Sequence, residues 1–238
     1  DDLSTFKSKS QRDSVKAIST DYTKRTSFNL MNVKKMRTGT TATPRIYDIE
    51  NFDFTYQYSL QYHRNIDIEY DEKKTYKGAI GYSYSKNPKN YKPFSKVPFL
   101  RKHKSLALIN DFNFNLLPKQ IGFRTDVNRM YNENLMRKKT RSIIIINPTY
   151  VKTFNWNRVY DLRYDFSRSL KLDYNASVQA RIDEPAGLVD RGSPSWDNTK
   201  DSIWQSVSDF GRTTNFSQNY NINYAVPINK IHFLDWVN

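Results

Sequence analysis

The chain has 238 residues, of which 37% are hydrophobic and 15% aromatic, and it carries a formal net charge of +14. It contains no cysteine, which excludes disulfide scaffolds, cysteine-ligated zinc and thiol catalysis, and no apolar run of about 18 residues that could form a transmembrane helix. A low hydrophobic fraction combined with many aromatic rings is typical of a transmembrane β-barrel, because each strand keeps one face in water.

Residues 1–25 are polar and are expected to be flexible, and residues 26–33 form the first candidate strand. The chain begins with Asp1 rather than Met and ends at Asn238, inside an apparent strand. We therefore expect it to be an internal piece of a longer polypeptide, in which residues 26–238 belong to one β-barrel that continues beyond both ends.

From residue 52 onward, aromatic or apolar side chains occupy even positions and polar ones occupy odd positions, and the even phase continues to Tyr70. Successive side chains of a strand point to opposite faces, so the pattern predicts one long strand over 52–70 with an aromatic face and a polar face. A tilted strand crosses a bilayer in about 9–11 residues, fewer than this segment offers. The polar cluster 71–74 is the expected turn.

Later segments repeat the alternation and are predicted strands: 76–84, 106–116, 121–127, 154–166, 170–182 and 216–226. Short turns are expected at 71–74, 118–119, 167–169 and 227–230, the last leading into a final strand. Long connections are expected at 86–104, 132–149 and 183–212, the last with a short amphipathic helix because Ile203, Val207 and Phe210 recur at helical spacing.

The alternation of short turns and long connections places all long connections on one side, as in outer-membrane barrels. We therefore predict an all-β fold, with about 8–9 antiparallel strands forming a wall segment of a much larger transmembrane β-barrel. The side chains expected to face lipid are Phe52, Phe54, Tyr56, Tyr58, Tyr82, Phe112, Phe114, Trp156, Tyr160, Leu162, Tyr164, Leu172, Tyr174, Ile222 and Tyr224. Those expected to face the lumen are Asp53, Gln57, Gln61, Asn113, Asn115, Arg124, Asp126, Asn157, Asp161, Arg163, Asp173, Asn175 and Asn221.

No catalytic constellation is present in the sequence, and we expect neither an enzyme nor a bound cofactor or metal. His63, His103 and His232 lie in separate segments and lack the spacing of metal ligands. Nucleophile-elbow, zinc-protease and phosphate-loop motifs are missing as well.

Basic residues gather in connections that the expected topology assigns to the long-loop side. They are Lys34, Lys35, Arg101, Lys102, Arg137, Lys138 and Lys139. They are either ordinary solvated loop residues or, as our functional hypothesis, contacts to phosphate groups of outer-membrane lipid. Nucleic-acid binding is disfavoured, because the aromatic rings lie on strands and not beside these basic runs.

Several segments resemble the SprA family, also called Sov, the giant outer-membrane translocon of the type 9 secretion system of Bacteroidota. They are 45–52 (RIYDIENF), 62–65 (YHRN), 74–79 (KTYKGA), 112–115 (FNFN), 117–119 (LPK), 123–126 (FRTD) and 235–236 (DW). The resemblance extends from residue 26 to the end of the chain and would cover a small part of a family member.

The resemblance implies a single-chain barrel of exceptional size that exports folded proteins, including gliding-motility adhesins, to the cell surface. It further implies exported partners with a type 9 C-terminal signal, a PorV-type outer-membrane barrel and a periplasmic plug protein, and it transfers no catalytic residue.

Three alternatives stay open from the sequence. The first is a TonB-dependent receptor or porin-type barrel of another envelope system. The second is a soluble carbohydrate-binding β domain that uses its Tyr and Trp side chains. The third, nucleic-acid binding, predicts a steep salt dependence of affinity.

Overall fold

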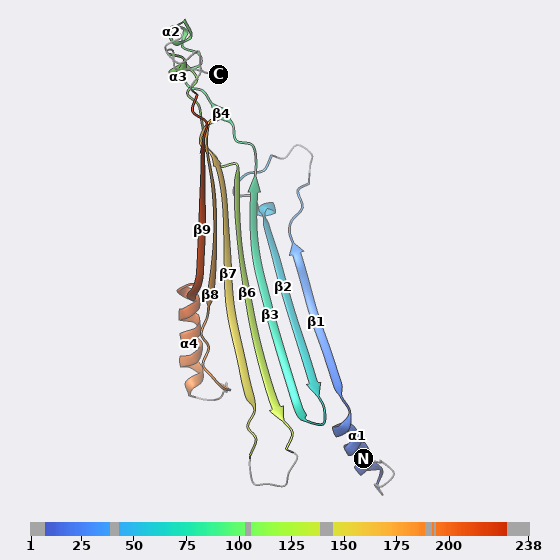
Figure 1. Ribbon diagram of the computed structural model, residues 1–238. Helices are drawn as coiled ribbons and strands as arrows, with labels where there is room; N and C mark the ends of the chain where they lie inside the picture. Colours follow the sequence, from blue (N-terminus) through green and yellow to red (C-terminus); the bar gives the residue numbers. More distant parts are fainter. Residues whose placement is uncertain are drawn as a thin grey trace.

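The computed structural model describes residues 8–38, 43–102, 106–138, 145–188, 192 and 194–227. Its main feature is one antiparallel seven-stranded sheet in the order β1-β2-β3-β6-β7-β8-β9 (Figure 1). The strands are β1 (Tyr22–Val33), β2 (Phe52–Arg64), β3 (Ile68–Ser85), β6 (Gln120–Met136), β7 (Thr149–Asp165), β8 (Leu170–Arg181) and β9 (Arg212–Tyr224). The expected all-β fold with antiparallel strands is confirmed at this level.

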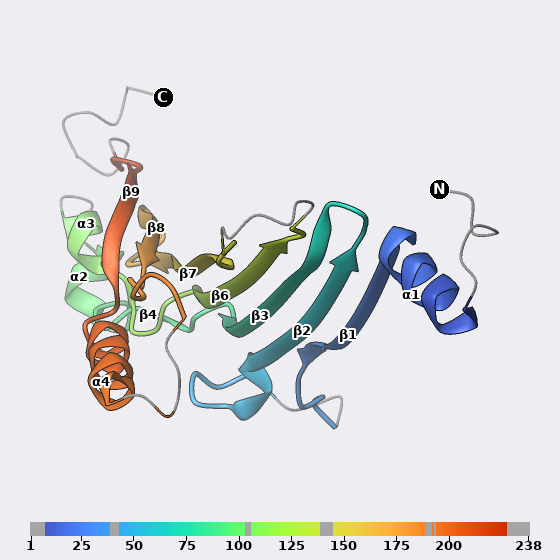
Figure 2. The same ribbon diagram turned by 90° about the horizontal axis from the view of Figure 1, so that it is seen from below.

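The central strands are long, since β3 has 18 residues and β6 and β7 have 17 each. Each strand pairs with the next one of the sheet, and the edge strands β1 and β9 have one neighbour each among the described residues. Seen along the strands, the sheet forms a curved row from β1 to β9 (Figure 2).

The single strand expected over 52–70 is wrong, because the chain reverses at Asn65. The Asn65 side-chain oxygen accepts hydrogen bonds from the backbone N–H groups of Asp67 (2.9 Å) and Ile68 (2.8 Å), a local arrangement that favours a turn. The turn expected at 71–74 is wrong for the same reason, since those residues lie inside β3. Even-numbered residues pair across the hairpin, as Tyr62 does with Glu72, so the alternation continues through the turn unchanged.

The strand expected over 106–116 is also wrong. The connection between β3 and β6 contains β4 (Asn90–Tyr91), α2 (Pro98–Lys102), α3 (Ala107–Asn110) and β5 (Phe114–Asn115), and β4 and β5 form a separate two-stranded sheet. Asn115 ties this segment to β7, because its amide donates to the carbonyl of Asp165 (2.6 Å) and its own carbonyl accepts from the Tyr164 hydroxyl (2.9 Å). Residues 118–119 therefore lead into β6 and do not turn between two strands of the sheet.

The expected separation of short and long connections is wrong as well. The connections 34–51, 86–119 and 166–169 lie at one end of the sheet, and the connections 65–67, 137–148 and 182–211 lie at the other (Figure 1). Each end thus has two long connections and one short turn. The short turn after β7 agrees with expectation, whereas the final strand expected after 227–230 lies outside the described residues.

Few side chains are buried in the described part of the chain. The buried apolar side chains are Ala79, Tyr84, Ala176, Ala180 and Ile182, which lie on β3 and β8 and directly after β8. The helix expected within 183–212 is confirmed as α4 (Ser195–Ser208), and η2 (Ile49–Asn51) precedes β2. A further helix, α1 (Lys9–Ser19), lies within the segment expected to be flexible, and no described helix combines the length and apolar character needed to span a membrane.

Candidate functional site

The two faces of the sheet are chemically different. The register aligns Phe52, Tyr82, Phe123 and Tyr160 across four neighbouring strands, and the rings of Phe52 and Tyr82 lie 5.0 Å apart while those of Phe123 and Tyr160 lie 5.2 Å apart. We call this side the aromatic face. It comprises Phe28, Leu30, Phe52, Phe54, Tyr56, Tyr58, Tyr76, Ile80, Tyr82, Tyr84, Phe123, Trp156, Tyr160, Leu162, Tyr164, Leu172, Tyr174, Tyr220, Ile222 and Tyr224.

Much of the aromatic face is exposed: Phe52 is 45% and Ile222 66% exposed. Along β3 the exposed and half-exposed part of its apolar row extends from Tyr76 to Tyr82, which corresponds to about 20 Å along the strand at roughly 3.3 Å per residue, and Tyr84 beyond it is buried. The apolar band on the outside of a membrane barrel is about 25 Å tall. The exposed length along β3 is therefore comparable to such a band and slightly shorter.

The opposite side, which we call the amide face, carries Asp53, Gln57, Gln61, Arg124, Asp126, Asn157, Asp161, Arg163, Asp173, Asn175 and Asn221. Some of its charges are paired: Arg124 contacts Asp126 at 3.0 Å, and Arg163 contacts Asp173 at 2.7 Å. Each such pair is polar and hydrated but carries no net charge.

A glycine makes room for one of these carboxylates. A Cβ atom at Gly81 would lie 2.1 Å from an Asp53 carboxylate oxygen, a distance that no packed atoms adopt. The missing side chain at position 81 lets the Asp53 carboxylate lie over the neighbouring strand, where it also approaches Arg124 at 3.8 Å.

The predicted residues separate by strand parity as expected, with four exceptions. Every predicted lipid-facing residue of the seven strands belongs to the aromatic face, and every predicted lumen-facing residue of these strands belongs to the amide face. Phe112, Phe114, Asn113 and Asn115 belong to neither face, because the segment that contains them lies outside the seven-stranded sheet.

The basic residues lie at both ends of the sheet, so their expected common side is wrong. Lys34 and Lys35 follow β1, and Arg101 and Lys102 end α2, at one end; Arg137 and Lys138 follow β6 at the other. Lys139 lies outside the described residues.

Two of these basic residues have structural partners. Lys35 contacts Glu50 at 3.0 Å, and its hydrogen bond lowers the pKa of the Glu50 carboxyl. The Arg137 backbone N–H donates to the Asp67 carbonyl at 2.7 Å, which joins the end of β6 to the β2–β3 turn. The ion pair makes Lys35 less available to a phosphate, whereas the backbone contact of Arg137 does not engage its guanidinium charge.

Two arginines on the aromatic face were missed by the sequence reasoning. Arg129 pairs with Glu184 through two hydrogen bonds of 2.5 and 3.1 Å, and the Glu184 side chain is only 5% exposed. Arg158 is 6% exposed, and its guanidinium lies 5.1 Å from the ring centroids of both Trp156 and Phe210. Glu184 and Phe210 belong to the connection 182–211, which therefore folds back over part of the aromatic face.

The end of α4 positions the Phe210 ring. Phe210 has a φ of 61° and Gly211 a φ of 71°, and the Gly211 N–H donates to the Ser206 carbonyl at 2.8 Å. A bulky residue rarely adopts a positive φ, so the backbone accepts strain to bring this ring over Trp156 and Arg158. No signal in the sequence marks this contact apart from Phe210 at helical spacing from Ile203.

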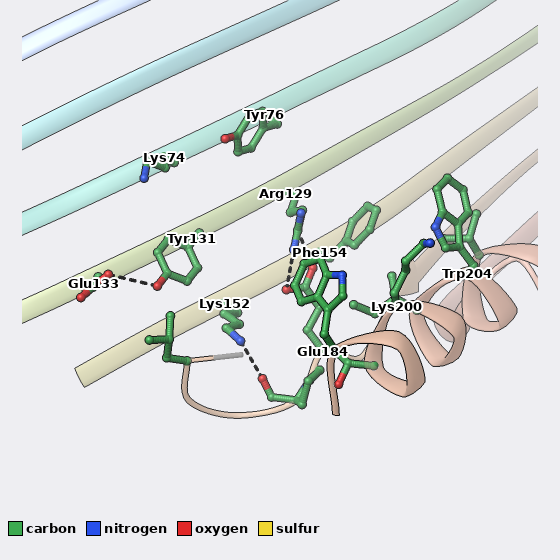
Figure 3. A pocket seen from close by; sticks show the side chains of 16 residues that line it. Lys74, Tyr76, Arg129, Tyr131, Glu133, Lys152, Phe154, Glu184, Lys200 and Trp204 are labelled. Atoms are coloured by element: carbon green, nitrogen blue, oxygen red, sulfur yellow. Dashed lines mark hydrogen bonds and ion pairs between the residues drawn. The ribbon is translucent and has the colours of Figure 1, made fainter. Parts of the chain in front are cut away.

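A cavity of about 710 Å³ lies between the connection 182–211 and the sheet (Figure 3). Its sheet side carries cations and rings from β3, β6 and β7, and its other side carries apolar side chains of α4 and the segment before it. The lining residues are Lys74, Tyr76, Arg129, Tyr131, Glu133, Lys152, Phe154, Glu184, Pro185, Leu188, Trp196, Thr199, Lys200, Ile203, Trp204 and Val207.

The described residues contain no group of three or more His, Asp or Glu side chains that could hold a metal ion. Comparison with known proteins identifies no family, since no family model matches the chain and no curated protein is significantly similar to it.

Proposed function

We propose that this chain forms part of the wall of an outer-membrane β-barrel, with the aromatic face against hydrocarbon and the amide face toward a water-filled lumen. The observation that carries the proposal is the exposed apolar band, which follows the sheet from strand to strand and extends about 20 Å along β3. Left in water, so many exposed rings would be an aggregation hazard, whereas lipid would cover them.

The position of α4 is compatible with this orientation. Between Tyr76 and the end of the sheet that carries the β2–β3 turn, the aromatic face becomes charged, with Lys74 on β3 and Lys152 on β7. Both lysines line the cavity beside α4. The helix therefore lies over the polar margin of the face, Phe210 at its end reaches Trp156 and Arg158, and most of the rest of the aromatic band stays exposed. Trp196 and Trp204 on this helix are of the residue type that favours the boundary between membrane and water.

We further propose that the barrel is the protein-conducting channel of a type 9 secretion system, which exports folded proteins to the cell surface. The support is the resemblance of the strand and turn segments to the SprA family together with the polar lining. A hydrated face of Asn, Gln, Ser and paired charges offers a passing protein little apolar surface to bind. Conduction is then passive, and exported proteins with a C-terminal signal, a PorV-type barrel and a periplasmic plug protein are the expected partners.

Site-specific photocrosslinking in cells tests the channel. A photoreactive phenylalanine analogue is placed at Gln57 or Asn157 on the amide face and, as matched controls one position away, at Tyr58 or Trp156 on the aromatic face. The proposal predicts adducts with an exported protein from the first pair and not from the second. Adducts from the aromatic pair alone would overturn it.

A soluble carbohydrate-binding β domain is the second candidate, favoured by the packing of α4 on one sheet face, as in soluble domains. It predicts that the chain folds as a monomer without detergent and that sugars quench its Trp fluorescence.

A further inference from the structure

The cavity beside α4 combines cationic and apolar surface in one place. From the sheet it is lined by Lys74, Arg129 and Lys152, and from the helix by Lys200, Ile203 and Trp204 (Figure 3). A phosphate or a hydrocarbon chain alone would use half of this lining, whereas an amphiphile would use both halves.

The internal ion pairs leave two of the four cations without a carboxylate. Arg129 is neutralised by Glu184, and Lys74 pairs with Glu72. Lys152 donates to the carbonyl of Pro185 at 2.9 Å and forms no direct ion pair among the described residues, although the charge of Glu184 acts on it, and Lys200 has no ion pair there. Two ammonium groups are therefore available to an anion.

The carboxylate of Glu133 does not neutralise them. It accepts hydrogen bonds from the hydroxyl groups of Tyr70 (2.7 Å) and Tyr131 (3.1 Å). In Figure 3 it lies at the opposite side of the cavity from Lys200. Glu133 is thus remote from Lys200, whereas Lys152 lies between the two.

The apolar part of the lining is incompletely covered. Leu188 and Trp204 are each 62% exposed, although both line the cavity. Side chains of this size gain stability when a hydrocarbon chain covers them and removes their apolar surface from water.

We propose that this cavity binds one anionic phospholipid, with Lys152 and Lys200 on either side of its headgroup and with Leu188 and Trp204 against the start of its acyl chains. The inference rests on the proposed function, because only the membrane orientation puts the polar margin of the aromatic face at the level of lipid headgroups. The bound lipid would fasten α4 to the barrel wall.

Native mass spectrometry of the full chain in detergent tests the site, with phosphatidylglycerol and phosphatidylcholine added in turn. The double variant Lys152→Gln/Lys200→Gln should retain phosphatidylglycerol at least about tenfold more weakly than the unmodified chain, because each lysine contributes to holding an anionic headgroup. Lys73→Gln/Lys77→Gln, which removes two lysines from the amide face of β3, is the matched control and should bind normally. Lys152→Arg/Lys200→Arg keeps both charges and should also bind normally.

Equal retention of phosphatidylglycerol by the Gln variant and the control would overturn the proposal, as would equal retention of the two lipids by the unmodified chain. Displacement of the lipid by millimolar inorganic phosphate would overturn it too, since a simple anion site needs no apolar wall. The two proposals can fail separately. If the Gln variant loses the lipid but photocrosslinking finds exported proteins on the aromatic face alone, the lipid site is supported and only the proposed channel function is rejected.

Discussion

The guanidinium of Arg158 lies 5.1 Å from the ring centroid of Phe210, on the aromatic face at the centre of β7. A cation facing hydrocarbon at this position would be costly, and the ring of Phe210 covers it. The contact links the end of α4 to the centre of β7, so it holds the connection 182–211 against the sheet.

Replacement of Phe210 by Ala should therefore lower the free energy of unfolding by about 1–2 kcal/mol, as expected for a partly desolvated cation–π contact. Urea denaturation of the purified chain measures the change. Phe216→Ala is the control, because Phe216 is also exposed on this face but has no cation over its ring among the described contacts. Equal losses in the two variants would show that Arg158 does not depend on Phe210.

Gly81→Ala should force the Asp53 carboxylate to rotate away, because the added methyl group overlaps it, and should destabilise the chain by less than about 1 kcal/mol, since the overlapping atoms are the end of a movable side chain. Combining it with Asp53→Ala should recover most of that loss, since the clash then disappears. Gly78→Ala is the milder control, as its Cβ would lie 3.2 Å from a Val127 methyl group. A double variant as unstable as Gly81→Ala alone would reject the proposed packing.

Asn65→Ala should cost about 1 kcal/mol of stability, because two backbone N–H groups lose their acceptor in the β2–β3 turn. Asn65→Asp keeps the acceptor oxygen and should be close to neutral. Hydrogen exchange at the Ile68 amide reports the effect directly and should become faster in the Ala variant only. Unchanged exchange in that variant would contradict the role of Asn65.

The pKa of the Glu50 carboxyl should lie below its ordinary value and should rise in Lys35→Gln, since the hydrogen bond from Lys35 is the largest cause of the lowering. A lowered folded-state pKa means that the contribution of Glu50 to stability is present above the unfolded pKa and is lost as the pH falls through the folded one. NMR titration of Glu50 checks this. Lys34→Gln serves as the control and should leave the titration unchanged.

The division into two faces could be predicted because it depends on parity alone. Once Tyr58 and Trp156 are known to lie on strands, the face of the sheet on which each side chain lies follows, because successive side chains of a strand point to opposite faces. The β2–β3 turn was misplaced for the same reason: pairing of Tyr62 with Glu72 preserves parity, so the alternation gave no signal at Asn65. The alternating rings at 112–116 were equally misleading, because only Phe114 and Asn115 there form a ladder.

The cavity could not be predicted, because its contacts join residues far apart in the sequence. Arg129 and Glu184 are separated by 55 positions, and their pairing depends on how the connection 182–211 folds back. A charged residue at an even position of β7, such as Arg158, looks like an irregularity in the sequence until the partner that covers it is known.

Electron paramagnetic resonance of spin labels placed singly from residue 156 to residue 163 along β7, in lipid bilayers, tests the central claim most directly. If the aromatic face meets lipid, accessibility to oxygen will peak at the even positions 160 and 162, away from the α4 contact, and accessibility to a water-soluble nickel complex will peak at 157, 161 and 163. Accessibility to the nickel complex that is equally high at even and odd positions, or highest at 160 and 162, would contradict a membrane-facing aromatic side.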